Sequence, residues 1–125
     1  MCDDWGYEKL HKMIQGRAVQ EMKHAEKLIE RILFLEGKPT VSNLKKIMIG
    51  ADVEGQLKND HFSEEGAVKS YNDGIALATK LADNGTKEIL DAILKDEEDH
   101  IDVIEAQQDQ IKQMSIQNYL MSQVG

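Results

Sequence analysis

The chain has 125 residues and a formal net charge of -8; 30% of its residues are charged and 41% are hydrophobic. This length predicts a single domain over residues 1–125, and the high charge with one proline favours an all-α fold of long amphipathic helices. The negative charge argues against nucleic acid or an anionic membrane as partner, because it attracts cations instead. No apolar stretch approaches the roughly 20 residues that span a bilayer. One cysteine and the lack of a signal-peptide pattern predict a cytoplasmic location.

The first predicted helix is long and covers residues 5–36. Asp3 and Asp4 can cap its first turn, and the Gly37-Lys38-Pro39 segment ends it. The connection that follows, up to residue 51, can reach about 45 Å when it is nearly extended. This reach is sufficient for one long crossover from one end of a helical bundle to the other.

Three further helices are predicted in the second half of the chain. One begins near Asp52 and ends near residues 83–85, where the asparagine or glycine of a turn signal can adopt a left-handed conformation. Thr86 is expected to cap the next helix, which continues to about Gln113. The tight turn between these two helices predicts an antiparallel hairpin. Residues 115–124 are expected to form a short C-terminal helix.

Each long helix carries an apolar stripe with the three- and four-residue spacing of a buried seam. Glu21 interrupts the first stripe, Glu64 the second, and Glu97 the third, each near the middle of its helix. Packing of the helices should therefore bring the three carboxylates into one layer. Burial of several carboxylates together is strongly unfavourable unless protons or a cation neutralise them. The pattern predicts a metal centre.

Two histidines extend this pattern. His24 follows Glu21 by three residues and His100 follows Glu97 by three, so each pair shares one helix face. Carboxylate and imidazole ligands suit iron, manganese or zinc, and paired Glu-x-x-His helices are typical of di-iron and di-manganese bundles. The alternative, solvated or salt-bridged side chains without a metal, does not explain why three seams are interrupted at one level. His61 lies one turn before Glu64 and is expected to be a core or rim histidine, with an auxiliary metal contact as the alternative.

Several segments closely resemble bacterioferritin, namely residues 21–26, 29–37, 96–102 and 117–120. The resemblance covers the whole chain and begins at the end of the family's first helix. It implies a ferritin-like four-helix bundle in which the first helix is absent, with three long helices, a short C-terminal helix and one crossover. The absent helix would leave an apolar groove, for which three interpretations stay open: a truncated gene product, a subunit completed by a partner's helix, or a chain that rearranges into a swapped assembly.

The resemblance also implies roles for individual residues. Glu21 and Glu97 would be the bridging carboxylates of a di-iron centre, and His24, His100 and Glu64 would be terminal ligands. The sixth ligand, a Glu of the family's first helix, has no counterpart.

Two further positions of the family pattern concern haem and iron transfer. Met22 matches the axial ligand of a haem b held at a subunit interface, although its helical position alone, about 100° from Glu21, indicates ordinary interface packing. The family's cage-wall iron site aligns with Gly16 and Gln20, which cannot serve as equivalent ligands.

The function implied by the resemblance is iron storage and detoxification. A ferroxidase would oxidise Fe(II) with oxygen or peroxide and deposit the product in an oligomeric cage, built from copies of this chain or mixed with complete subunits. Two alternatives stay open. One is a degenerate, non-catalytic haem-binding or structural subunit, which the missing ligand favours, and the other is a small di-metal oxidase without storage.

Overall fold

The computed structural model describes residues 8–38 and 52–124, which form three α-helices. These are α1 (Glu8–Phe34), α2 (Val53–Lys80) and α3 (Asn84–Ser122). The described residues contain no strand, and the predicted all-α class is confirmed. The expected capping residues Asp3 and Asp4 and the connection over residues 39–51 lie outside the described residues.

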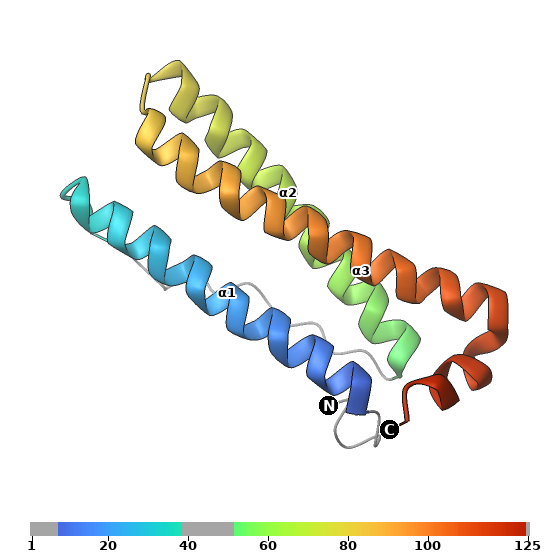
Figure 1. Cartoon of the computed structure of the whole chain (residues 1–125). Helices are drawn as coiled ribbons and strands as arrows, with labels where there is room; N and C mark the ends of the chain where they lie inside the picture. The colour runs from blue at the N-terminus through green and yellow to red at the C-terminus, as the bar shows by residue number, and fades with distance from the viewer. Residues whose placement is uncertain (1–7, 39–51, 125) are drawn as a thin grey trace.

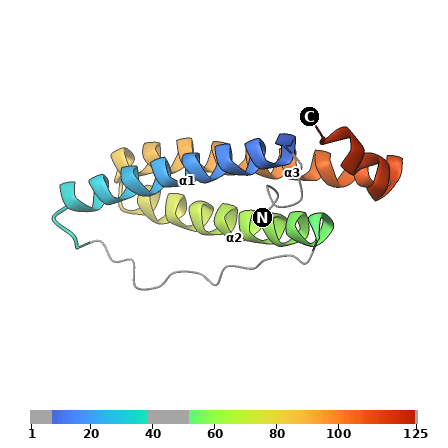
Figure 2. The same ribbon diagram turned by 90° about the horizontal axis from the view of Figure 1, so that it is seen from below.

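The three helices lie side by side with their long axes roughly aligned. α1 and α2 run in the same direction, and α3 runs in the opposite direction (Figure 1). α2 and α3 pack along each other as the predicted antiparallel hairpin, whereas α1 approaches α3 closely at fewer positions. In Figure 2, turned by 90°, α1 overlaps α3 in the view and α2 lies below both. Parallel α1 and α2 need a connection that returns along the bundle, in agreement with the expected crossover.

Aspartates begin both helices of the hairpin. The Asp52 carboxylate accepts a hydrogen bond from the Gly55 backbone N–H at 2.7 Å and caps α2. The Asp83 carboxylate accepts from the Thr86 backbone N–H at 3.2 Å and caps α3. The prediction that Thr86 is the cap was therefore wrong. α3 already begins at Asn84, and the Thr86 hydroxyl donates to Asp83 at 2.6 Å.

The left-handed residue of the turn between α2 and α3 is Ala82, with φ of 56°. The Asp83 N–H donates to the Ala78 carbonyl at 2.8 Å and the Ala82 N–H to the Thr79 carbonyl at 3.1 Å, the pattern of a Schellman motif. The expectation of asparagine or glycine in this conformation was wrong, because the Asp83 cap places both of those residues in the first turn of α3.

An arginine ties the end of α1 to this turn. The Arg31 guanidinium donates to the Thr86 hydroxyl at 3.0 Å and to the Asp83 carboxylate at 2.9 Å, and it lies 4.8 Å from the centre of the Phe34 ring. Hydrogen bonds from Thr86, with a smaller contribution from Arg31, hold the pKa of Asp83 below its usual range. α1 is thus connected to the hairpin by polar contacts at this end of the bundle.

The opposite end is closed by apolar packing. Ser115 has a φ of 69° and breaks the helical path of α3, so its last turns bend back toward the start of α1 (Figure 1). This segment is the short C-terminal helix expected from the sequence. It carries the fully buried Tyr119, and the Lys9 N–H donates to the Gln123 carbonyl at 3.3 Å. The buried cluster here consists of Leu10, Val53, Leu57, Ile104, Ile111 and Tyr119.

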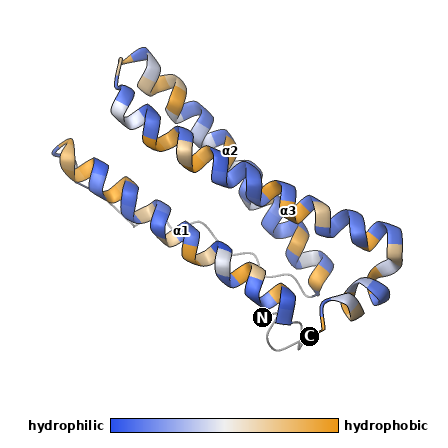
Figure 3. Cartoon of the chain, viewed as in Figure 1, coloured by the Kyte–Doolittle hydropathy of each residue, from blue (hydrophilic) through white to orange (hydrophobic). Residues whose placement is uncertain are grey.

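Polar and apolar residues alternate along all three helices (Figure 3). In α2 and α3 the residues of the predicted stripes are buried or partly buried, as the seam spacing predicts. The stripe of the first helix differs, because Ala18, Ala25, Ile32 and Leu35 are exposed, so the expectation of a buried seam was wrong at these residues. None of the described helices has the length and apolar character required to cross a membrane.

Replacing Ala82 with Gly is expected to stabilise the protein by about 1 kcal/mol, because glycine adopts a positive φ without the steric cost that alanine bears. Ala76 is exposed in the helical part of α2, so Ala76→Gly is the matched control and should destabilise by about 1 kcal/mol. Urea denaturation of the two variants measures both values. Equal effects of the two substitutions would contradict the assignment of strain to Ala82.

Candidate metal centre

Four side chains from the three helices meet near the middle of the bundle. They are Glu21 of α1, Glu64 of α2, and Glu97 and His100 of α3, and one ligand atom of each lies within 4.8 Å of all the others. Glu97 is 1% and Glu64 is 5% exposed, whereas Glu21 and His100 are partly buried. The structure therefore brings together the carboxylates of the three interrupted seams and one of the two histidines in a single group.

The atoms that face one another in this group have no hydrogen-bond partner among the described residues. His100 Nδ1 lies 3.4 Å from Glu21 Oε1, 3.7 Å from Glu64 Oε2 and 3.9 Å from Glu97 Oε2. Buried polar atoms without partners cost about 1–3 kcal/mol each, and more when they are charged. A cation among the four atoms would satisfy all of them at once, so the donor set fits a metal ion.

The two central carboxylates lie between two histidines. His24 Nδ1 is 3.1 Å from Glu97 Oε1 and 3.8 Å from Glu21 Oε2, on the side opposite His100. The two imidazole rings are 6.5 Å apart. Each of Glu21 and Glu97 thus presents one oxygen to each histidine, an arrangement in which two ions can share both carboxylates.

His24 lies outside the group of four and already has partners. Its Nε2 is 2.8 Å from Asp96 Oδ2, and its Nδ1 contacts Glu97. A carboxylate at the outer nitrogen fixes the orientation of an imidazole and makes it a stronger metal ligand. Sequence reasoning missed Asp96. Its position directly before Glu97 did not reveal that it faces α1.

An arginine also lies against the centre, and the sequence reasoning missed it. Arg17 of α1 is 3.2 Å from Asp60 and 3.5 Å from Glu64 Oε1, and the Gln56 amide donates to Asp60 at 2.9 Å. Glu64 therefore has one oxygen toward Arg17 and the other toward the group. The available signal was spacing, since Arg17 precedes Glu21, and Asp60 precedes Glu64, by four residues on the same helix face.

Crowding of carboxylates changes the protonation of the layer. Burial, followed by contacts with Glu64 and Glu21, raises the pKa of Glu97 far above its usual range. Burial and the three carboxylates raise the pKa of Tyr71 to about 12. Without a cation the layer therefore keeps a proton on Glu97 at neutral pH, and a metal ion has to displace it.

Two other predicted residues, Met22 and His61, lie outside the group of four. Met22 is 65% exposed on α1. His61 lies at the rim between α2 and α3, with Nδ1 2.7 Å from Glu65 and Nε2 3.0 Å from Glu105, and it is not part of the group of four. The hydrogen bond to Glu105 is the main reason that the pKa of His61 is raised. Gln20 contacts His100.

Comparison with known proteins places the chain in a family. A family model described as a ferritin-like domain matches residues 1–114. A bacterioferritin from Brucella melitensis is 37% identical over 95% of this chain and 74% of its own length. A bacterial ferritin from Synechocystis is 38% identical over 100% of this chain and 81% of its own length. The chain belongs to the bacterioferritin family. The expected ferritin-like fold is thereby confirmed.

In this bacterioferritin-family chain, Glu97→Gln is expected to stabilise the metal-free protein and to weaken metal binding. The folded pKa of Glu97 lies above the unfolded value, so folding takes up a proton and stability falls as the pH rises above the unfolded pKa. The glutamine side chain has nearly the same shape as that of glutamate but carries no charge. The expected gain is about 1–2 kcal/mol near pH 8 and shrinks toward pH 5.

Urea denaturation of chelator-treated protein at both pH values, with zinc titration calorimetry, measures these effects. Glu98 is exposed on the same helix, so Glu98→Gln is the matched control and should behave like the wild type at both pH values. A Glu97→Gln variant indistinguishable from this control would contradict the role of Glu97 in the layer.

Proposed function

We propose that the chain is an iron-storage and detoxification subunit that binds Fe(II), oxidises it with oxygen or peroxide, and passes Fe(III) into an oligomeric cage. The observation that carries the proposal is the set of four buried ligand atoms without partners in Glu21, Glu64, Glu97 and His100. Several metals fit carboxylate and imidazole ligands, and membership in the bacterioferritin family favours iron among them.

The two sides of the layer offer different ligand sets. Glu21 and Glu97 serve both sides. On one side, Glu64 and His100 complete a set of four donors, and the first Fe(II) binds there. On the other side, the donors in reach are His24 and the two shared carboxylates, and His24 first has to give up its contact with Glu97.

Charge favours oxidation in this layer. Carboxylate oxygens stabilise Fe(III) more than Fe(II), because the interaction energy grows with the charge of the ion. Each Fe(II) gives one electron to the oxidant. The proton that Glu97 holds in the absence of a cation leaves as the metal binds.

Haem binding at a subunit interface is the second part of the proposal. Met22 is 65% exposed, so the thioether sulfur is accessible to a ligand outside the chain. A thioether is an axial ligand that haem iron accepts. One Met22 from each of two copies would hold one haem b between them.

An anaerobic Fe(II) titration followed by oxygen tests the iron chemistry. We expect about two Fe(II) per chain and a rapid rise in ferric absorbance, as a two-metal site requires. Glu64→Gln should lose the tighter binding phase, because it removes a donor from the four-ligand side, and the exposed Glu98→Gln should retain it.

The iron content of the sized particle then separates the candidate functions. Uptake far beyond the bound pair means storage, whereas uptake that stops at about two per chain means a local di-metal oxidase. Absence of bound iron in the wild type would contradict the iron-binding proposal and leave a haem-binding or structural subunit.

Met22→Leu is expected to abolish haem binding while Fe(II) oxidation persists, because Met22 is not part of the carboxylate layer. Met121 is also a highly exposed methionine, 74% exposed on α3, so Met121→Leu is the matched control. Haem per chain, measured by the pyridine haemochrome after reconstitution, distinguishes the two variants. Equal haem content in both would contradict the assignment of Met22.

A further inference from the structure

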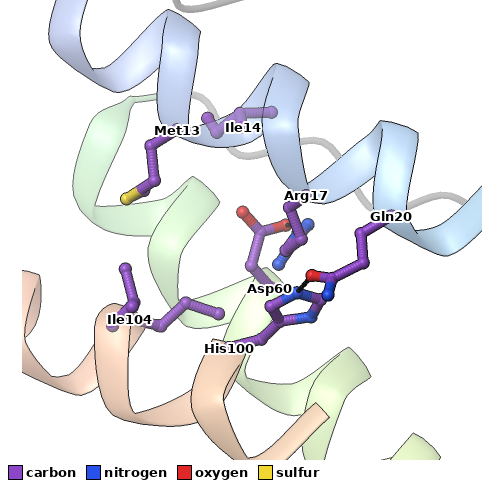
Figure 4. A pocket seen from close by; sticks show the side chains of 8 residues that line it. Met13, Ile14, Arg17, Gln20, Asp60, His100 and Ile104 are labelled. Atoms are coloured by element: carbon purple, nitrogen blue, oxygen red, sulfur yellow. Dashed lines mark hydrogen bonds and ion pairs between the residues drawn. The ribbon is translucent and has the colours of Figure 1, made fainter. Parts of the chain in front are cut away.

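A glutamine of α1 contacts one of the histidines of the metal layer. The side-chain amide oxygen of Gln20 lies at hydrogen-bond distance from Nε2 of His100 (Figure 4). The other ring nitrogen, Nδ1, is the one that faces Glu21, Glu64 and Glu97. Both side chains line a cavity that Arg17 and Asp60 also line. Neither composition nor helix spacing assigned a role to Gln20.

This contact fixes the position of the proton on His100. A neutral imidazole carries one N–H, and an amide oxygen only accepts hydrogen bonds. Nε2 of His100 therefore donates to Gln20, and Nδ1 carries a lone pair. The other ring nitrogen agrees with this tautomer, because Nδ1 is buried without a hydrogen-bond partner and the nearest carboxylate oxygen, on Glu21, is 3.4 Å away. An N–H at Nδ1 would draw that carboxylate to about 2.8 Å.

We propose that Gln20 is a positioning residue that holds His100 in the Nε2–H tautomer, so that Nδ1 is ready to bind a metal ion. The proposal rests on the proposed function, in which His100 is a ligand. Gln20 touches neither the ion nor the oxidant. It acts through His100, as hydrogen-bond acceptors behind metal-binding histidines generally do.

The choice of a neutral amide matters in this layer. Three carboxylates already converge here, and a fourth negative charge at Gln20 would make the metal-free layer still harder to bury. An amide oxygen orients the ring without adding charge. His24 differs, because its outer nitrogen faces the carboxylate of the partly exposed Asp96.

Gln20→Leu, Gln20→Glu and Gln15→Leu test the proposal. Leucine removes the acceptor while nearly preserving side-chain volume, glutamate restores an acceptor, and Gln15 is an exposed glutamine of the same helix that provides the matched control. Solid-state NMR of histidine labelled with nitrogen-15 identifies the His100 tautomer in chelator-treated protein. Visible absorption during a Co(II) titration measures affinity and the ligand field.

We expect the Nε2–H tautomer in the wild type and in Gln15→Leu. Gln20→Leu should show a mixture of tautomers, an altered Co(II) spectrum and affinity reduced about 10–100-fold, the usual effect of losing such an acceptor. Gln20→Glu should restore both the tautomer and the affinity. Rescue of this kind separates positioning from a general structural role.

Retention of the tautomer and of Co(II) affinity in Gln20→Leu would overturn the proposal. An Nδ1–H tautomer in the wild type would overturn it as well, because the amide would then have to be reversed and donate to Nε2. Failure of the wild type to bind Co(II) would instead count against the proposed function, and the tautomers of the metal-free proteins would still decide the role of Gln20.

Discussion

The structure depends on the burial of three carboxylates in one layer at the middle of a helical bundle. Glu97 and Glu64 are almost fully buried. Arg17 offsets part of the negative charge by its contact with Glu64, and a proton on Glu97 offsets a further part. The rest of the free-energy cost of burying these charges lowers the stability of the metal-free protein. Such a loss of stability is usual at sites that bind an ion.

Contacts at the two ends of the bundle help to offset this cost. At one end the C-terminal turns of α3 close an apolar cluster around Tyr119. At the other end Arg31 joins α1 to the turn between α2 and α3. These end contacts act together with the mid-bundle contacts of Arg17 with Asp60 and of His24 with Asp96 to keep α1 in register. The register of α1 in turn decides whether Glu21 reaches the other carboxylates.

Sequence reasoning located the layer because helical periodicity is a local property. Spacing along one helix shows that Glu21 interrupts an apolar stripe, and the same holds for Glu64 and Glu97, although Ala18 and Ala25 on either side of Glu21 are exposed. The helix ends were less predictable. Asp83 and Thr86 are both good capping residues, and the sequence does not show that Thr86 instead hydrogen-bonds to Asp83 while Arg31, from a distant helix, contacts both.

The contacts behind the ligands could not be predicted, because they depend on how neighbouring helices are rotated. Gln20 and His100 are 80 residues apart, and His24 and Asp96 are 72 apart. Spacing within a helix gives no information on such pairs. Two Glu-x-x-His pairs that look equivalent in the sequence therefore acquire different partners, a neutral amide behind one histidine and a carboxylate behind the other.

This difference makes the two sides of the layer chemically unequal. On the His24 side a carboxylate, Asp96, lies behind the imidazole, but one carboxylate fewer faces the ion position. The His100 side gains the charge of Glu64, and under the tautomer proposed for His100 no proton has to be removed from Nδ1. Under the proposed function, the His100 side keeps its ion longer, whereas the ion beside His24 exchanges faster.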